Sequence, residues 1–144
     1  MKVTVWLAEG TWRACVDAVS TLGPELEITL LHVADDDVGD AMRFAYHGLL
    51  SRHGHDPADT VDPVAVPAER ALLDDAKARL GRECAVRVRH GHVEREVVAA
   101  CADADVLVCA RDGERGHAGP KSLGHHTRFV VDHAPCAVLL VWPG

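Results

Sequence analysis

A glycine-rich segment spanning residues 110–127 carries the residue types best suited to chemistry in this chain of 144 residues. It reads Ala-Arg-Asp-Gly-Glu-Arg-Gly-His-Ala-Gly-Pro-Lys-Ser-Leu-Gly-His-His-Thr. Glycines let backbone N–H groups approach an anion, and a helix that begins near Gly124 would point the positive end of its dipole at that anion. The segment therefore predicts a site for a small phosphate-bearing ligand. A solvated crossover loop is the alternative interpretation, since glycine is common in loops.

The charge distribution favours a small anion over a polymer. The formal net charge is −7, but residues 111–128 carry +2 and the rest of the chain −9. Binding to nucleic acid or anionic lipid depends on a basic surface, so neither is expected as a partner. The apolar runs are shorter than a membrane span, and the N-terminus lacks the pattern of a secretory signal. We expect a cytoplasmic protein without membrane contact.

Histidine and cysteine are the residue types that could serve as metal ligands or nucleophiles. The ten histidines include three close pairs, but no pair has a visible partner pair, so no metal site is predicted. The five cysteines contain no CxxC motif and are expected to be reduced core residues. Cys109 and Cys136 lie at the edges of apolar strands, where burial makes a thiol unreactive. No catalytic triad or carboxylate pair stands out, and catalysis is not the expected function.

The elements that must position the glycine-rich segment alternate between strands and helices. Thr11 is expected to cap the first helix through its hydroxyl, and Gly23 with Pro24 to end it. The segment from Val38 to Gly81 is irregular, with a possible helix at 39–52 and prolines before a clearer helix at 67–80. Strands are expected at 2–7, 26–33, 84–90, 105–110 and 137–142, and further helices after Thr11, from Val93 to about Ala104 and up to about His133. This order predicts one α/β domain with a doubly wound parallel sheet.

Several of these pieces resemble the universal stress protein family, and the resemblance covers the whole chain. The pieces are Glu9-Gly10-Thr11, Leu30-Leu-His-Val33, Ala110-Arg-Asp-Gly113, Gly124-His-His-Thr127 and the most specific one, His133-Ala-Pro-Cys-Ala-Val-Leu-Leu-Val141. The resemblance implies a five-stranded parallel sheet of order 3-2-1-4-5 in three αβα layers. It also implies a homodimer and, as in many members, ATP or another adenine nucleotide, with Mg²⁺, in a cleft.

The family's nucleotide pattern, G-x2-G-x9-G-[ST], is only partly matched. Its first glycine falls on Ala110, ten residues separate Gly113 from Gly124, and His125 replaces the usual hydroxyl residue. The resemblance implies phosphate contacts in the glycine-rich segment, base contact by the main chain of one residue, and ribose or cation contact in the first turn. The corresponding residues are Gly113, Gly116, Gly124, His125, His126 and Thr127 for phosphate, Val33 for the base, and Glu9 in the first turn, with Ala110 and Thr11 at matching positions.

Three functions remain open from the sequence. The first is a non-catalytic sensor that binds an adenine nucleotide or a related anion. The second is a homodimeric interaction module with a degenerate cleft, suggested by the substitutions at Ala110 and His125 and by the longer loop. The third is a slow nucleotide hydrolase with Glu9 or His125 as the acid–base group.

The last strand, from Val138 to Trp142, is apolar and would lie at the edge of the sheet. An uncovered apolar edge invites pairing with a second strand. A homodimer formed through this strand is therefore expected, and coverage by residues 34–66 is the alternative.

Overall fold

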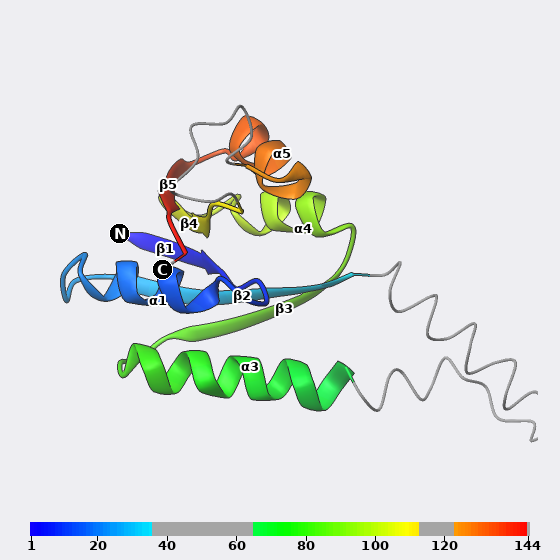
Figure 1. Cartoon of the computed structure of the whole chain (residues 1–144). Coiled ribbons are helices and arrows are strands. Elements are labelled where there is room, and N and C mark those ends of the chain that lie inside the picture. The colour runs from blue at the N-terminus through cyan, green and yellow to red at the C-terminus, as the bar shows by residue number, and fades with distance from the viewer. Residues whose placement is uncertain (36–64, 113–122, 144) are drawn as a thin grey trace, which may run out of the picture.

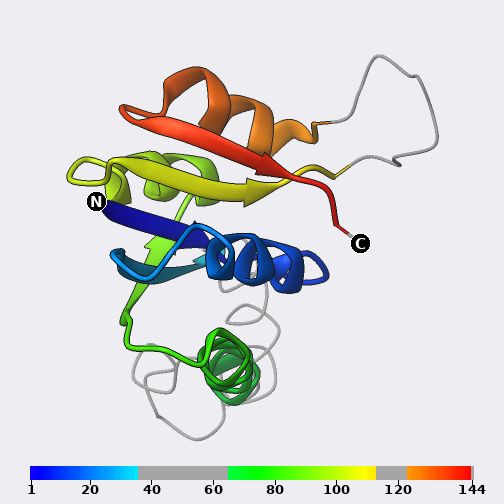
Figure 2. The ribbon, with the colours of Figure 1, turned by 90° about the vertical axis from the view of Figure 1, so that its left-hand side faces the viewer.

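The computed structural model describes residues 1–35, 65–112 and 123–143. Five parallel strands form one sheet in the order β3-β2-β1-β4-β5. They are β1 (Lys2–Trp6), β2 (Glu27–Asp35), β3 (Ala85–Gly91), β4 (Val106–Ala110) and β5 (Ala137–Val141). The expected α/β class and strand order are confirmed, and Figure 2 shows β1, β4 and β5 running the same way, with the C-terminus near their carboxyl ends.

Helices cover both faces of the sheet and make the three layers (Figure 1). Helices α1 (Trp12–Ser20) and α3 (Ala65–Leu80) lie on one face, and α4 (Val93–Ala100) and α5 (His125–His133) on the other. Each face has its own core. One joins Val5 and Leu30 to Val16 of α1, and the other joins Leu31 and Leu107 to helix residues such as Val97 and Val130.

Alternation along β1 and β2 explains why both faces are buried. Val5 faces the α1 side and its neighbour Trp6 faces the α4 side, because successive side chains of a strand point to opposite faces. Strands that are covered on both sides need apolar residues at nearly every position, which is how the central strands of this sequence read.

Three local expectations are corrected. The Thr11 hydroxyl makes no capping hydrogen bond, although Thr11 is the N-cap residue of α1. Helix α3 begins at Ala65 rather than near residue 67, because a proline in the first helical turn removes no intrahelical hydrogen bond. Helix α4 ends at Ala100 and tighter turns follow it through Ala104. The possible helix at 39–52 lies outside the described residues.

Helix α1 ends as expected from its sequence. The helix stops at Ser20, and Gly23 adopts a φ of +104°, a left-handed conformation that glycine tolerates without strain. The guanidinium of Arg82 donates hydrogen bonds to the carbonyls of Gly23 and Pro24, which ties this turn to the start of β3. This turn therefore lies at the amino ends of the strands, whereas ligands of such sheets usually bind at the carboxyl ends.

In the described residues, no helix combines the length and apolar character needed to cross a membrane.

Candidate functional site

The candidate site lies between β1 and β4, where the strand order reverses. Chain connections run outward in opposite directions from these two strands, and in such sheets ligands bind at the carboxyl ends near this point. A cavity of about 130 Å³ opens there. Its lining comes from both strand ends and from the start of α5, and consists of Trp6, Ala8, Thr11, Ala110, Asp112, His126 and Thr127.

The turn after β1 forms one wall of the cavity. The amides of Thr11 and Trp12 both donate to the carbonyl of Ala8, and Gly10 has a φ of +83° that permits this tight turn. Thr11 makes no capping hydrogen bond with its hydroxyl, and it lines the cavity. Glu9 is exposed and does not line the cavity.

Asp112 organises the opposite wall. Its carboxylate accepts a hydrogen bond of 2.7 Å from the backbone amide of Gly124, the N-cap residue of α5. The hydroxyl of Thr127 lies 3.3 Å from both carboxylate oxygens and donates to them. Asp112 therefore caps α5 from outside the helix, since Gly124 has no side chain to do so.

This capping arrangement has the donor groups of an anion site, and the protein's own Asp112 carboxylate occupies them. A backbone N–H, a hydroxyl and the positive end of a helix dipole converge on one carboxylate, as they would on a phosphate. Gly124 and Thr127 are two of the residues expected to contact phosphate. Asp112 belongs to the Ala110–Gly113 segment that carries the family resemblance, but its contact with the first turn of α5 was not predicted.

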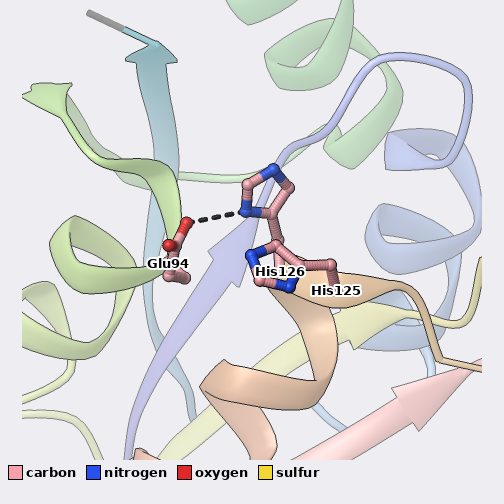
Figure 3. A group of neighbouring side chains, drawn as sticks. All are labelled: Glu94, His125 and His126. Atoms are coloured by element: carbon pink, nitrogen blue, oxygen red, sulfur yellow. Dashed lines mark hydrogen bonds and ion pairs between the residues drawn. The ribbon is translucent and has the colours of Figure 1, made fainter. Parts of the chain in front are cut away.

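A second acidic group approaches the start of α5 from α4. Oε2 of Glu94 lies 2.6 Å from Nδ1 of His126, and the Glu94 side chain is 18% exposed (Figure 3). A hydrogen bond from its own backbone amide lowers the pKa of Glu94, and His126 and His125 lower it further. One potential ligand atom from each of Glu94, His125 and His126 lies within 4.8 Å of the others.

The sequence alone contained a weak signal for Glu94. Helices α4 and α5 follow β3 and β4, so a doubly wound sheet starts both helices at its carboxyl edge. They also pack on the same face, with Val97 and Val130 in one core. Spacing could not reveal the cluster, because Glu94 and His126 are 32 positions apart in the sequence.

The remaining expected site residues fall in different places. Val33 is buried in the core on the α4 side and does not line the cavity. The carbonyl of Leu31 accepts a hydrogen bond from the amide of Leu7, so it points toward β1. Carbonyls two residues apart on a strand point to the same side, so the Val33 carbonyl also points toward the β1 side. It lies past the end of β1, because Trp6, the last residue of β1, pairs with Leu31. Gly113 and Gly116 lie outside the described residues.

A larger hollow of about 740 Å³ lies at the opposite edge of the sheet, beside Pro24 and Arg82. It borders the amino ends of β2 and β3, and the Arg82 guanidinium is already engaged by backbone carbonyls. The smaller cavity is the candidate functional site, because it combines the strand reversal, a helix N-terminus and convergent polar groups.

Three of the five cysteines are buried in the core, as the sequence predicted, whereas Cys84 and Cys136 are only partly buried at its margin, so the burial expected for Cys136 is corrected. All five are free thiols, and Cys15, Cys101 and Cys109 are buried. Burial is the main cause that raises the pKa of Cys109 to about 11, and Asp112 and Cys136 raise it further. A thiol with this pKa is protonated at neutral pH and is a poor nucleophile.

Comparison with known proteins identifies the class. The universal stress protein family matches residues 13–141. The chain belongs to the universal stress protein family. No curated protein matches it significantly.

Solved structures agree with the fold. The hypothetical protein MJ0577 superimposes with a TM-score of 0.70 at 18% identity, covering 99% of this chain and 96% of that one. The universal stress protein UspA from Lactobacillus plantarum gives 0.65 at 19% identity, with coverage of 98% and 97%. A universal stress protein in complex with cAMP gives 0.60 at 19% identity, with coverage of 100% and 98%.

Proposed function

We propose that this protein is a non-catalytic sensor that binds an adenine nucleotide at the carboxyl ends of β1 and β4. The observation that carries the proposal is the convergence of the Gly124 amide and the Thr127 hydroxyl on one carboxylate. A nucleotide phosphate would take the place of the Asp112 carboxylate. The complex of a structural neighbour with cAMP supports the same ligand class.

The dimensions of the cavity limit how the nucleotide would bind. At about 130 Å³ the cavity is smaller than typical ligand pockets, which begin near ~300 Å³. It suits a phosphate group, so the base and ribose would lie outside it, toward the end of β2 at Val33. The largest ligand that we propose for this site is ATP with Mg²⁺. Glu9 would then bind the cation or the ribose.

Calorimetry tests this proposal in the wild type and in Asp112→Asn. We expect ATP, AMP or cAMP to bind the wild type, and to bind Asp112→Asn more tightly because the competing negative charge is gone. Asp103→Asn removes the same charge at the opposite edge of the sheet and should leave the affinity unchanged. An absence of heat with all three nucleotides in both the wild type and Asp112→Asn would refute nucleotide binding.

The second candidate is an interaction module with a degenerate cleft. The observation that favours it is that the anion donors already hold Asp112 while the cavity stays small. Under this function the protein copurifies with no nucleotide, and Asp112→Asn does not create a nucleotide site. Mass spectrometry of the protein as purified, without added ligand, separates the two candidates, because stoichiometric nucleotide would exclude the second.

We also propose that two chains associate through β5. This strand, Ala-Val-Leu-Leu-Val, lies at the sheet edge, and every one of its residues is at least partly exposed. The other edge strand, β3, carries Arg87, Arg89 and His90, which discourage pairing. Such a dimer would act as the signalling unit, and it is compatible with cytoplasmic location.

A further inference from the structure

The side chains of Glu94, His125 and His126 form a cluster at the start of α4 and α5 (Figure 3). Glu94 is the second residue of α4, and the two histidines are the first two residues of α5. The histidine ring centroids are 5.1 Å apart in an edge-on orientation, and one potential ligand atom from each of the three residues lies within 4.8 Å of the others. The cluster therefore draws on two helices that are packed together in one core.

An ordinary ion pair accounts for only part of this arrangement. The 2.6 Å contact between Glu94 and His126 is a hydrogen-bonded pair and does not require His125. The position of His125 therefore needs a separate explanation. A cation bound between the three side chains would supply it, because neutral imidazole nitrogens and carboxylate oxygens are metal ligands.

We propose that Glu94, His125 and His126 bind a divalent transition-metal ion of the zinc class, with one coordination position left for water or an anion. Two imidazole nitrogens and one carboxylate oxygen are a ligand set that zinc uses at open sites. Magnesium is disfavoured because it prefers oxygen ligands. On binding, the metal would take the place of the hydrogen bond between His126 and Glu94, with the imidazole in its neutral form and its remaining N–H on the other ring nitrogen.

The geometry requires only a small closure of the cluster. Zinc bonds of ~2.0–2.2 Å in a tetrahedron place neighbouring ligand atoms about 3.3 Å apart. The 2.6 Å contact must open and the 4.8 Å span must shorten. Side-chain rotation achieves both, since His125 and His126 are exposed.

The coordination position left for water or an anion would lie near the candidate anion site. His126 also lines the cavity that holds Asp112 and Thr127. A metal on His126 would add positive charge at the rim of the anion site, but its three protein ligands and a water would bind it without a nucleotide. The metal site therefore does not depend on nucleotide binding.

Zinc titration of the tag-free, chelator-treated protein, without nucleotide, tests the site. We expect one zinc per chain by calorimetry, and visible Co²⁺ absorption typical of low coordination number. Glu94→Gln, His125→Gln and His126→Gln should each weaken zinc binding at least about tenfold, because even the loss of an outer-shell partner can cost that much. Magnesium at the same concentrations should not compete.

His133→Gln is the matched control, because His133 is an exposed histidine at the other end of α5, stacked on Phe129. Its zinc affinity should equal that of the wild type, and circular dichroism should show that every variant is folded. The proposal is overturned if the wild type binds no zinc at micromolar concentration. It is also overturned if folded Glu94→Gln and His126→Gln bind as tightly as the wild type, or if magnesium competes equally.

Discussion

The Asp112 carboxylate accepts a 2.7 Å hydrogen bond from the Gly124 amide, and a Cβ added at Gly124 would overlap the same carboxylate oxygen. The two residues therefore depend on each other. Gly124 needs Asp112 to cap α5, and Asp112 can approach only because position 124 has no side chain. The φ of −69° at Gly124 is one that any residue adopts, so the requirement for glycine is steric.

Asp112→Ala should destabilise the protein by about 1 kcal/mol, which is the typical cost of losing a helix cap. Asp112→Asn retains an oxygen acceptor for the Gly124 amide and should cost less. Urea unfolding at pH 7 measures both. If the two variants are as stable as the wild type, the carboxylate does not cap α5.

Gly124→Ala should cost about 1–3 kcal/mol in the wild type, because the methyl group displaces Asp112. In an Asp112→Ala background the obstacle is absent, and the same substitution should cost at least about 1 kcal/mol less, within the range of coupling between contacting residues. A double-mutant cycle by chemical denaturation gives this coupling. Additive effects would contradict the steric relationship.

The contact between α1 and α3 should depend on pH. Nε of Arg79 donates to Asp17 at 2.7 Å and Nη2 at 2.8 Å, and this hydrogen bonding lowers the pKa of Asp17. A lowered pKa contributes stability above the ordinary aspartate pKa of ~3.9, and that contribution is lost as the pH falls through the folded-state value.

Asp17→Asn should therefore lower the Tm slightly at pH 7, and the difference from the wild type should vanish in acid. The effect is small because both side chains are about half exposed. Thermal melts between pH 7 and pH 2 check this, with Asp75→Asn as a control at an exposed aspartate of α3. A difference in Tm that is constant with pH would rule out this ion pair as its cause.

Thiol labelling should separate the cysteines into two groups at pH 8. Burial raises the pKa of Cys15 to about 12, and burial with Cys136 nearby raises that of Cys101 to about 12. These thiols and Cys109 should react with a disulfide reagent only after unfolding. The half-buried Cys84 and Cys136 should react sooner. Rapid labelling of all five in the native protein would contradict the packing.

Association through β5 should be sensitive to charge at that edge. Leu140→Lys places a cation on the partly exposed strand, and we expect light scattering after size exclusion to show a monomer where the wild type is a dimer. Val88→Lys makes the same change on β3, where Val88 is 40% exposed, and should leave the dimer intact. A monomeric wild type, or dissociation by both variants, would refute the β5 interface.

The sequence predicted the strands well because burial on both faces requires nearly continuous apolar runs, as in Val106–Ala110. The order of the strands came from the family resemblance, since an alternation of elements fixes a parallel sheet but not its sequence of neighbours. Helix boundaries were less accurate. Ala65 was missed because proline at position 67 reads as a breaker, although the first helical turn accepts it.

The candidate site was only partly predictable. Gly124 and Thr127 could be identified as anion donors from a motif, but the group that they bind could not. Asp112 contacts Gly124, which is 12 positions away in the sequence, and Glu94 contacts His126, which is 32 positions away. Such contacts depend on how the helices pack at the carboxyl edge, which local patterns do not encode.

The contrast between the two edge strands limits how large an assembly of this sheet can become. An apolar β5 can pair with another β5 about a twofold axis, which uses the same surface on both chains and leaves none unpaired. In the proposed dimer, β3 would form both outer edges of the combined sheet, where Arg87 and Arg89, held by contacts with α4, would leave positive charge. Growth would then stop at two chains, and this charge would protect the assembly against fibre formation.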